Sequence, residues 1–406
     1  MYQIGLKLWS INTDVYLQQA EKLFADGIFS YIELFVVPGS LEHLPAWKKL
    51  KCPFIIHNAH FMQHFNLAKR EKEADNRKIY EETRRFADEL NAKYIIFHGG
   101  IEGSIEETAR QLASFRELRA VIENKPFRAL PNRMGGEFCR GYNIAELKTV
   151  MDAAGCGFCL DFGHAICAAN SQHADPYEYI REMKETLSPS MFHLTDIDDI
   201  TSEWDSHPHL GGGQLDLGKI CSMLPEDAIV TAETNKNSKT DLQDFIPDSQ
   251  TLRFYDLSCR KVTTEDATVV FDISNDPAVR AMSFRKEPLI WEDHLNWFEQ
   301  KIHDPDCFFY LFESAAGNIA AQIRFQRIEP ARFIVNYSLA REYRGKHCSV
   351  RILSMGISRL KKDFGGHCVL IASIKHENIA SQRCFKKTGF QPLSSDDDHM
   401  DFSYEL

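Results

Sequence analysis

Long apolar runs are absent from this 406-residue sequence. No stretch of about 18 consecutive apolar residues occurs, so we expect no membrane-spanning helix. The first ten residues, MYQIGLKLWS, do not combine a basic segment with an apolar core and a cleavage site. We therefore expect a cytoplasmic protein. Hydrophobic residues make up 44% of the chain, which indicates a folded protein rather than a disordered one.

An excess of positive charge is also missing. Residues 1–250 hold 26 Lys and Arg against 37 Asp and Glu, a net charge of −11, and residues 251–406 hold 21 of each kind. Such an acidic first part is poorly suited to grip a polyphosphate backbone. The charge thus counts against a nucleic-acid partner, although a local basic groove would still be compatible with it.

Paired cysteines are scarce, although the chain has 11 Cys. Their odd number and scattered positions predict reduced thiols rather than a disulfide framework. Cys156 and Cys159 form a CxxC motif, but no second pair lies nearby. We expect these two side chains to pack in the core rather than to bind zinc.

What the sequence does contain is a regular alternation of short apolar runs and amphipathic stretches over its first 235 residues. This alternation is typical of parallel strands covered by helices. Eight such units in about 240 residues predict a (β/α)8 TIM barrel, with a doubly wound open sheet as the alternative. The expected strands are residues 3–9, 31–37, 54–59, 94–100, 119–124, 157–163, 191–197 and 228–234.

Metal-competent side chains stand at the ends of six of these apolar runs. They are His57, His98, Glu123, Asp161, His193 and Glu233. In a barrel the carboxyl ends of the strands converge on one face, so we expect these side chains to meet there. Asp161 has a second interpretation, because an Asp in this position also caps the helix that is expected to start near Ala165. His164 follows three residues later and adds to the metal interpretation.

The pattern changes after residue 235. Residues 235–251 are polar and predict a last short helix that runs into a linker. A strand is expected at 252–257, then helices that carry two Trp, then successive strands at 307–314, 319–328 and 332–340. Strands in series predict an α+β fold. We therefore expect two domains, 1–245 and 252–406.

The first domain resembles the xylose isomerase-like barrels, most closely their endonuclease IV branch. The resemblance rests on IIHNAH, YIIFHGG, AVIENK, CLDFGHA, FHLTD, WDSHPHLGGGQLD and TAETNK. It implies two or three divalent ions, zinc or manganese. It also implies nine metal ligands: His57, His98, Glu123, Asp161, His164, His193, Asp205, His207 and Glu233.

Nine ligands are too many for one tetrahedral zinc, which indicates a cluster of ions bridged by carboxylates. Glu123 and Asp161 are the expected bridges, and with Glu233 they are candidate catalytic carboxylates. Glu33, in YIELF, matches an acid that is common in the sugar-isomerase members and is a fourth candidate. The superfamily cleaves abasic DNA and also isomerises and epimerises sugars, so the resemblance leaves the reaction open.

The second domain resembles GNAT-type N-acetyltransferases. The resemblance rests on YRGKHCSVRIL (343–353) and IKHENIASQRCFKKTGFQPL (374–393). It implies acetyl-CoA as cofactor. Backbone amide groups at a helix N-terminus would bind the pyrophosphate of this cofactor. His347 occupies the place of the first glycine of the family's phosphate loop. The implied cofactor-binding residues are Arg344, Gly345, Lys346, His347, Ser349, Asn378, Ser381 and Phe385.

A more specific resemblance lies at 273–302, ISNDPAVRAMSFRKEPLIWEDHLNWFEQKI. It is similar to acetyltransferases that act on the 4-amino group of nucleotide-linked amino sugars, on routes to nonulosonic acids. The hypothesis is therefore a fusion that modifies one sugar or nucleotide sugar twice, in nonulosonic acid or surface polysaccharide synthesis. An abasic-site phosphodiesterase with an accessory GNAT domain is one alternative. A sensor that binds acyl-CoA without turnover is another.

Overall fold

The computed structural model describes residues 1–238 and 240–406. The chain forms two compact units. One consists of residues 2–217 and 227–252, and the other of residue 1, residues 218–226 and residues 253–406. Among the described residues, no helix has both the length and the hydrophobicity to cross a membrane.

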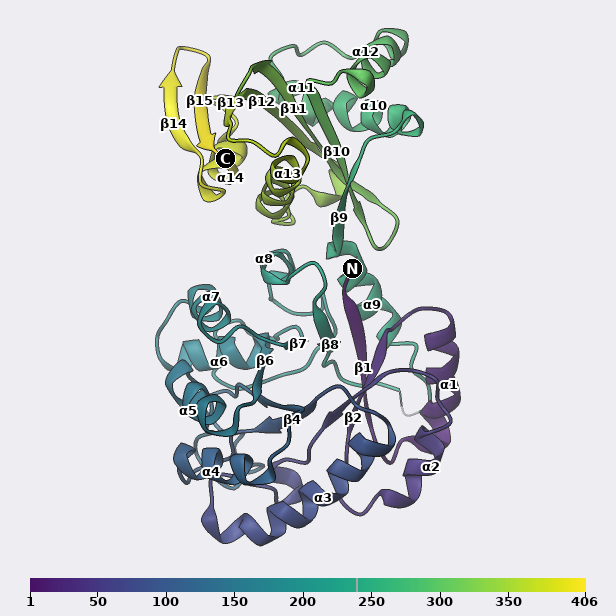
Figure 1. The fold of residues 1–406 in the computed structure, drawn as a ribbon, viewed down its shortest axis with the longest axis vertical. Helices are drawn as coiled ribbons and strands as arrows, with labels where there is room; N and C mark the ends of the chain where they lie inside the picture. The colour runs from purple at the N-terminus through teal and green to yellow at the C-terminus, as the bar shows by residue number, and fades with distance from the viewer. Residues whose placement is uncertain (239) are drawn as a thin grey trace. The chain divides into compact units, whose positions relative to one another are not determined.

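The first unit is built on a closed barrel of eight parallel strands (Figure 1). Each strand pairs with the next, and β1 closes the barrel by pairing with β8. The strands are β1 Gln3–Trp9, β2 Tyr31–Phe35, β3 Phe54–His57, β4 Ile95–His98, β5 Ala120–Glu123, β6 Gly157–Asp161, β7 Met191–Leu194 and β8 Ile229–Ala232. The predicted (β/α)8 barrel is confirmed.

Helices follow the strands and cover the barrel, and several of them begin at side-chain caps. Ser104 accepts a hydrogen bond from the backbone N–H of Glu107 at the start of α4, and Asn143 caps α5 in the same way. The helices are α1 Thr13–Ala25, α2 Leu44–Trp47, α3 Glu73–Glu89, α4 Ile105–Phe115, α5 Ile144–Ala154, α6 Phe162–Ser171, α7 Pro176–Leu187 and α9 Phe245–Tyr255. Helix α8 Leu217–Met223 precedes β8 in the chain, but all of it after Leu217 belongs to the other unit.

One layer of apolar side chains fills the barrel interior. It comes from seven of the eight strands and includes Tyr31, Ile96 and Met191. Since this packed layer fills the barrel, polar side chains nearer the carboxyl ends of the strands lie above a solid floor.

The prediction of a strand at residues 252–257 is wrong. Helix α9 continues to Tyr255, and β9 begins at Leu257. Phe245, Ser249, Leu252 and Tyr255 are buried at three- and four-residue spacing, which is the period of a helix. Leu252 and Tyr255 therefore extend the buried face of α9 rather than starting a strand.

The second unit contains a seven-stranded sheet in the order β14-β15-β13-β12-β11-β10-β9. The strands are β9 Leu257–Lys261, β10 Cys307–Ser314, β11 Ile319–Glu329, β12 Arg332–Leu339, β13 Val369–Lys375, β14 Gln391–Ser395 and β15 His399–Glu405. The helices are α10 Ala267–Asn275, α11 Pro277–Met282, α12 Trp291–His303, α13 Ser349–Phe364 and α14 Ile379–Lys387. The predicted α+β fold is confirmed.

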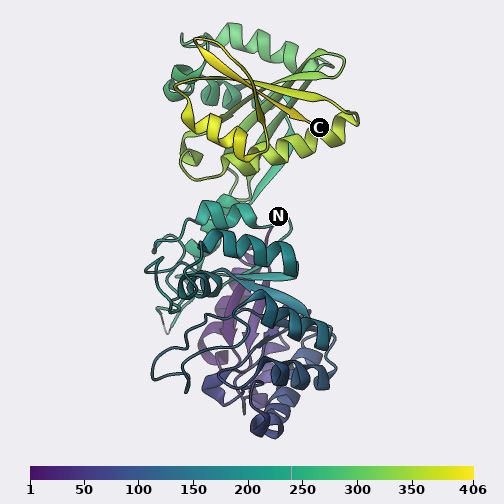
Figure 2. The ribbon, with the colours of Figure 1, turned by 90° about the vertical axis from the view of Figure 1, so that its left-hand side faces the viewer.

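Helices cover both faces of this sheet (Figures 1 and 2). On one face, Val270 of α10 and Phe298 of α12 pack against Phe309 and Leu311 of β10. On the other face, α13 brings Gly356 so close that a Cβ there would lie 3.0 Å from Ile323. Neighbouring residues of a strand face opposite sides, so the central strands β10 and β11 contribute side chains to both helix layers.

Candidate metal centre and acetyltransferase site

The six strand-end side chains meet at the carboxyl face of the barrel. His57, His98, Glu123 and Asp161 are each the last residue of their strand, and Glu233 follows β8 directly. The ladder sets His98 beside Glu123 and Asp161 beside His193. The nine predicted ligands form three groups, and Glu123 belongs to two of them.

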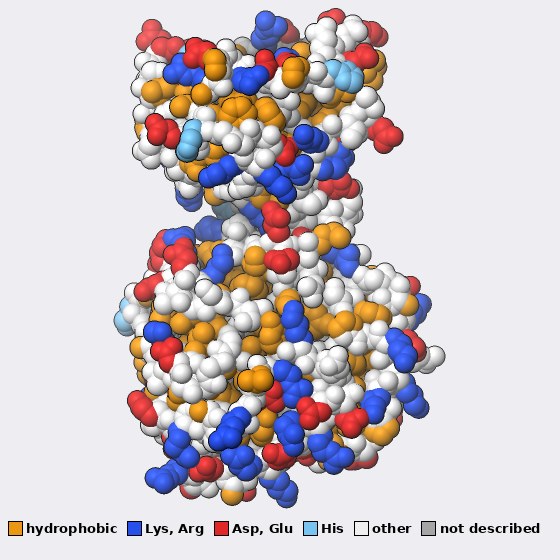
Figure 3. All heavy atoms as spheres, viewed as in Figure 1, with side chains coloured by type: hydrophobic (Ala, Val, Ile, Leu, Met, Phe, Trp, Pro, Cys, Tyr) orange, Lys and Arg blue, Asp and Glu red, His pale blue; other side chains and the backbone are white. Residues whose placement is uncertain are grey.

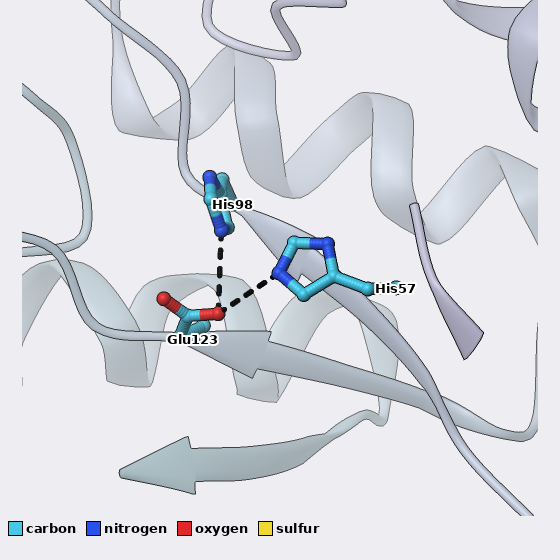
Figure 4. Close-up of side chains that lie close together, drawn as sticks. All are labelled: His57, His98 and Glu123. Carbon is cyan, nitrogen blue, oxygen red and sulfur yellow. Dashed lines mark hydrogen bonds and ion pairs between the residues drawn. The ribbon is translucent and has the colours of Figure 1, made fainter. Parts of the chain in front are cut away.

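The first group joins β3, β4 and β5 (Figure 4). Oε2 of Glu123 lies 3.2 Å from Nε2 of His57 and 3.2 Å from Nε2 of His98. Nδ1 of His57 lies 2.8 Å from the carbonyl oxygen of Asn58. If Nδ1–H donates to that carbonyl, Nε2 is free of a proton and faces the group as a metal ligand would.

The second group consists of Glu123, Asp161, His193 and Glu233. Nδ1 of His193 lies 2.9 Å from Oε2 of Glu233, 3.4 Å from Oε2 of Glu123 and 3.8 Å from Oδ2 of Asp161. Three carboxylates around one imidazole form an anionic pocket, and such a donor set suits a divalent cation.

The third group lies beside them and contains His164, Asp205 and His207. Oδ2 of Asp205 lies 3.0 Å from Nε2 of His164 and 2.8 Å from Nε2 of His207. Nδ1 of His207 lies 2.9 Å from the carbonyl oxygen of Glu233, which ties this loop histidine to the end of β8. The loop between β7 and β8 therefore brings ligands that no strand carries.

Asp161 plays both roles that its sequence position suggested. Its Oδ1 accepts a hydrogen bond of 2.7 Å from the backbone N–H of His164 and so caps α6. Its Oδ2 accepts no hydrogen bond from any described residue, although the side chain is fully buried. Oδ1 of Asp205 is also buried and accepts no hydrogen bond from any described residue. Buried carboxylate oxygens without a donor are costly, so the residues present fit bound cations.

Glu33 lies behind His193 rather than among the nine ligands. Its Oε2 accepts hydrogen bonds from His193 Nε2 at 2.8 Å and from Thr231 Oγ1 at 2.6 Å. Its Oε1 lies 3.2 Å from Nζ of Lys7, which also pairs with Glu233. Glu33 thus orients His193 so that Nδ1 faces the other ligands.

Two buried lysines, Lys7 and Lys125, lie beside the ligand carboxylates. Neither was among the site residues expected from the sequence. Nζ of Lys125 lies 3.4 Å from Oε1 of Glu123 and 3.0 Å from Nε2 of His164. The available signal was a charged residue within an apolar run, in IGLKLW, and another just after one, in VIENK. Burial of such a charge requires anionic partners, and these are the ligand carboxylates.

Burial and mutual charge shift the acidities across the centre. Burial lowers the pKa of His98 to about 3, and burial raises the pKa of Asp161 to about 6. Burial alone would lower the pKa of His207, but Asp205 raises it to about 9. Since imidazole binds a metal in its neutral form, a cation here would displace the proton of His207.

The predicted cofactor-binding residues of the second unit lie on two segments. Gly345 and His347 have φ of +73° and +54°, so the turn before α13 uses the left-handed region twice. Arg344 Nη1 contacts Asp276 Oδ1 at 2.7 Å. Ser349 is the first residue of α13. Lys346, between the two left-handed residues, adds a positive charge to the turn.

The other segment is α14, which packs against α13. Asn378 caps α14 by accepting a hydrogen bond of 3.1 Å from the backbone N–H of Ser381. The Ser381 hydroxyl lies 3.2 Å from that of Tyr337 on β12. Phe385 is buried between the rings of Tyr337 and Phe390. Seven of the eight predicted residues therefore lie at the starts of α13 and α14, and Phe385 lies in the last turn of α14.

Strands β12 and β13 pair over only a short part of their length. The two pair only where Arg332–Ile334 run beside Val369–Ile371, and over the described residues no ladder continues between them beyond Ile334. The remaining edge of β12 can thus offer backbone groups to an extended ligand.

The sequence model of a family described as "Xylose isomerase-like TIM barrel" matches residues 46–250, half of the chain. The chain belongs to this family. Curated relatives in it include probable endonuclease 4 of Mycobacterium bovis, 28% identical over 209 residues, which cover 50% of this chain and 81% of the relative. The Mycobacterium ulcerans protein of the same name is 26% identical over 209 residues, with the same coverage.

A second sequence model, "Acetyltransferase (GNAT) domain", matches residues 256–391, so a GNAT domain follows the barrel. Among solved structures, a D-tagatose 3-epimerase-like protein aligns with 62% of this chain and 96% of its own, at 15% identity and a TM-score of 0.49. Spermidine N-acetyltransferase from Vibrio cholerae, solved with CoA and spermine, aligns with 37% of this chain and 94% of its own, at 13% identity and a TM-score of 0.34.

Proposed function

We propose that the chain is a bifunctional sugar-modifying enzyme. The barrel would isomerise, epimerise or hydrolyse a sugar or nucleotide sugar with the help of two or three divalent ions, zinc or manganese. The GNAT domain would transfer acetyl from acetyl-CoA to an amine of the sugar. The observation that carries the barrel assignment is the meeting of nine imidazole and carboxylate ligands in three groups, two of which share Glu123.

The proposed metal ligands are the nine residues of the three groups. Bound divalent ions would polarise a substrate oxygen and lower the pKa of a bound water. Glu123 would hold two ions, because it belongs to two groups, whereas Asp161 belongs to one. Glu33 would act as a positioning residue through its hydrogen bond with His193. Lys7 and Lys125 would hold the carboxylates in place and add positive charge beside an anionic substrate.

Acetyl-CoA would bind along the part of β12 that does not pair with β13. The amide groups at the start of α13 and the positive charge of Lys346 would face its pyrophosphate. Asn378, Ser381 and Phe385 would line the other side, on α14. The similarity of residues 273–302 to nucleotide-amino-sugar acetyltransferases supports an amino sugar of nonulosonic acid or surface polysaccharide synthesis as the acceptor.

The test joins elemental analysis with a thiol-release screen. Purified protein is expected to carry at least two divalent ions per chain, and acetyl-CoA is expected to release free CoA when amino sugars or their nucleotide forms are added. The variant D161N is expected to lose metal, whereas the control D152N, an exposed acid on α5, is expected to keep it. Metal-free protein with full barrel activity would contradict the proposal.

The curated endonuclease 4 relatives favour a second candidate function, phosphodiester cleavage at abasic sites in DNA. The acidic balance of residues 1–250 weighs against it. On the barrel face in view, acidic and basic side chains are interspersed (Figure 3). Incubation of the metal-loaded protein with abasic duplex separates the candidates, because strand cleavage supports the nuclease and its absence, together with turnover of a sugar, supports the sugar enzyme.

A further inference from the structure

A cavity of about 590 Å³ lies on the α10 and α12 side of the GNAT sheet. Its volume is within the range of roughly 300–1,000 Å³ that small-molecule sites occupy. The wall is formed by the segment that follows α10, and the floor by β10, β11 and β12. Lining residues used below are Ser274, Trp297, Phe309, Gln322, Arg324 and Asn336.

The floor follows from the register of three strands. Arg324 of β11 pairs with Phe309 of β10 and with Asn336 of β12. Gln322 stands two residues earlier on β11, so it faces the same side of the sheet as Arg324. A polar pair thus occupies the face on which the neighbouring β10 positions are apolar.

Arg324 brings to this floor a positive charge that the carboxylate of Asp304 influences only at a distance. Its guanidinium lies 5.0 Å from the ring centre of Trp297. The side chain is half-buried, and among residues 1–238 and 240–406 it has no ion-pair partner and donates no side-chain hydrogen bond. Its guanidinium stays charged and offers several donors in a fixed plane. A planar donor set of this kind matches a phosphate or a carboxylate.

Gln322 brings an acceptor that is also without a partner. Its Nε2 donates a hydrogen bond of 2.7 Å to Oγ of Ser274. Its Oε1 receives no hydrogen bond from any described residue, although the side chain is only 7% exposed. An N–H or O–H group of a ligand in the cavity would satisfy it.

The acidic lining residues do not cancel the charge of Arg324. Glu287 and Asp293 line the cavity too, but both are exposed. Arg280 at the same rim donates to the carbonyl oxygens of Glu287 and Arg285. The half-buried charge of the floor is therefore the guanidinium of Arg324, whereas water screens the rim carboxylates.

We propose that this cavity is the acceptor site of the GNAT domain and that its acceptor carries an anionic group, phosphate or carboxylate, which Arg324 binds while Gln322 accepts a hydrogen bond from the acceptor. The proposal rests on the proposed acetyltransfer. In that step the acceptor nitrogen forms a bond with the thioester carbonyl carbon. The C–S bond breaks, and the proton lost by the nitrogen ends on the CoA sulfur.

The test measures thiol release from acetyl-CoA with four acceptors. They are a nucleotide-linked 4-amino sugar, the same sugar freed of its nucleotide, muramic acid as a carboxylate-bearing amino sugar, and spermidine. We expect a KM at least about tenfold lower for an anionic acceptor than for the free sugar, and no turnover of spermidine. Preference for the nucleotide-linked sugar identifies the anion as phosphate, and preference for muramic acid identifies it as carboxylate.

Variants separate binding of the anion from loss of fold. R324M is expected to raise KM for the anionic acceptor about 10- to 100-fold and to leave KM for the free sugar unchanged. R324K keeps a charge but loses the planar fork, so KM should rise about tenfold even if R324M does not fold. R332M is the control, because Arg332 lies outside the cavity with its side chain 48% exposed.

Equal KM values for free and anionic acceptors would overturn the proposal, as would an unchanged KM in folded R324M or R324K. These results would leave acetyltransfer itself intact, because thiol would still be released. No thiol release with any acceptor would instead overturn the acetyltransfer function, and the proposal with it.

Discussion

Replacement of Glu33 by Gln tests whether this side chain positions a ligand or touches the substrate. Glu33 is completely buried and contacts His193, Thr231 and Lys7 at 2.8, 2.6 and 3.2 Å. Burial alone would raise its pKa, but His193 and Lys7 more than offset this and lower the pKa to about 2. The side chain is therefore a carboxylate at neutral pH, and Gln removes its charge with little change of shape.

The magnitude follows from the three contacts. Hydrogen bonds to a charged group contribute about 1.5–3 kcal/mol and neutral ones about 0.5–1.5, so each contact weakens by about 1 kcal/mol. Lys7 keeps Glu233 as its partner, so we expect E33Q to lose about 2–3 kcal/mol of stability. Loss of a partner behind a ligand histidine also lowers metal affinity by about 10- to 100-fold.

The assay is a competition titration of metal-free protein with zinc and a chelating dye, together with thermal unfolding with and without zinc. E42Q is the matched control, because the Glu42 side chain is 72% exposed. Folded E33Q with wild-type zinc affinity would refute the positioning role. If such a variant also lost kcat, Glu33 would act directly on the substrate instead.

Three further substitutions test other parts of the chain. D205N should lower the bound metal by one equivalent per chain, because Asp205 contacts both His164 and His207. Elemental analysis measures this, and an unchanged metal content would contradict the grouping of these three residues. H347G should raise the free energy of unfolding by about 1 kcal/mol, because glycine adopts the φ of +54° found at His347 without strain. It should also tighten CoA binding measured by calorimetry, and a weaker affinity would contradict this. Asp266 bonds Arg260 and Thr263, and the Arg260 hydrogen bond lowers its pKa. Its contribution is present above about pH 4 and fades below it, so D266N should cost about 1–2 kcal/mol at pH 7 and less at pH 3 in urea unfolding; an equal cost at both pH values would contradict this.

The barrel and the meeting of the candidate ligands at one face could be predicted because several strands end where their apolar residues end. In VIEN and CLDF the change from apolar to acidic marks the carboxyl end of the strand, and parallel strands bring such ends together. The same rule failed at Leu252, where apolar letters belong to the face of α9. Three apolar residues within four positions, Leu252, Phe254 and Tyr255, fit a helix and a strand equally well, and only the neighbours in space decide between them.

The roles of Arg324 and Gln322 could not be predicted for a different reason. In IAAQIRFQRI the polar letters alternate with apolar ones, which is also the pattern of a strand with one face in water. That β11 lies under α12 depends on contacts between residues far apart in the chain, such as Arg324 with Trp297. The alternation of residues in β11 predicts which side chains share a face of the sheet, but it does not predict which helix covers that face.

Charge balance gives one reason for both the lysines and the metal in the barrel. Five carboxylates meet there, from Glu33, Glu123, Asp161, Asp205 and Glu233, and Lys7 and Lys125 supply two positive charges. With the imidazoles neutral, as metal ligands must be, the sum is −5 + 2 = −3, and bound cations would compensate this charge in place of the protons that His207 and His164 hold without metal. Two divalent ions would bring the sum to +1 and three to +3, so a fully loaded centre favours an anionic substrate. The anionic acceptor proposed for the GNAT cavity would likewise bring negative charge to a half-buried cation, so the proposal of one phosphate-bearing sugar for both halves of the chain is consistent with both charge balances.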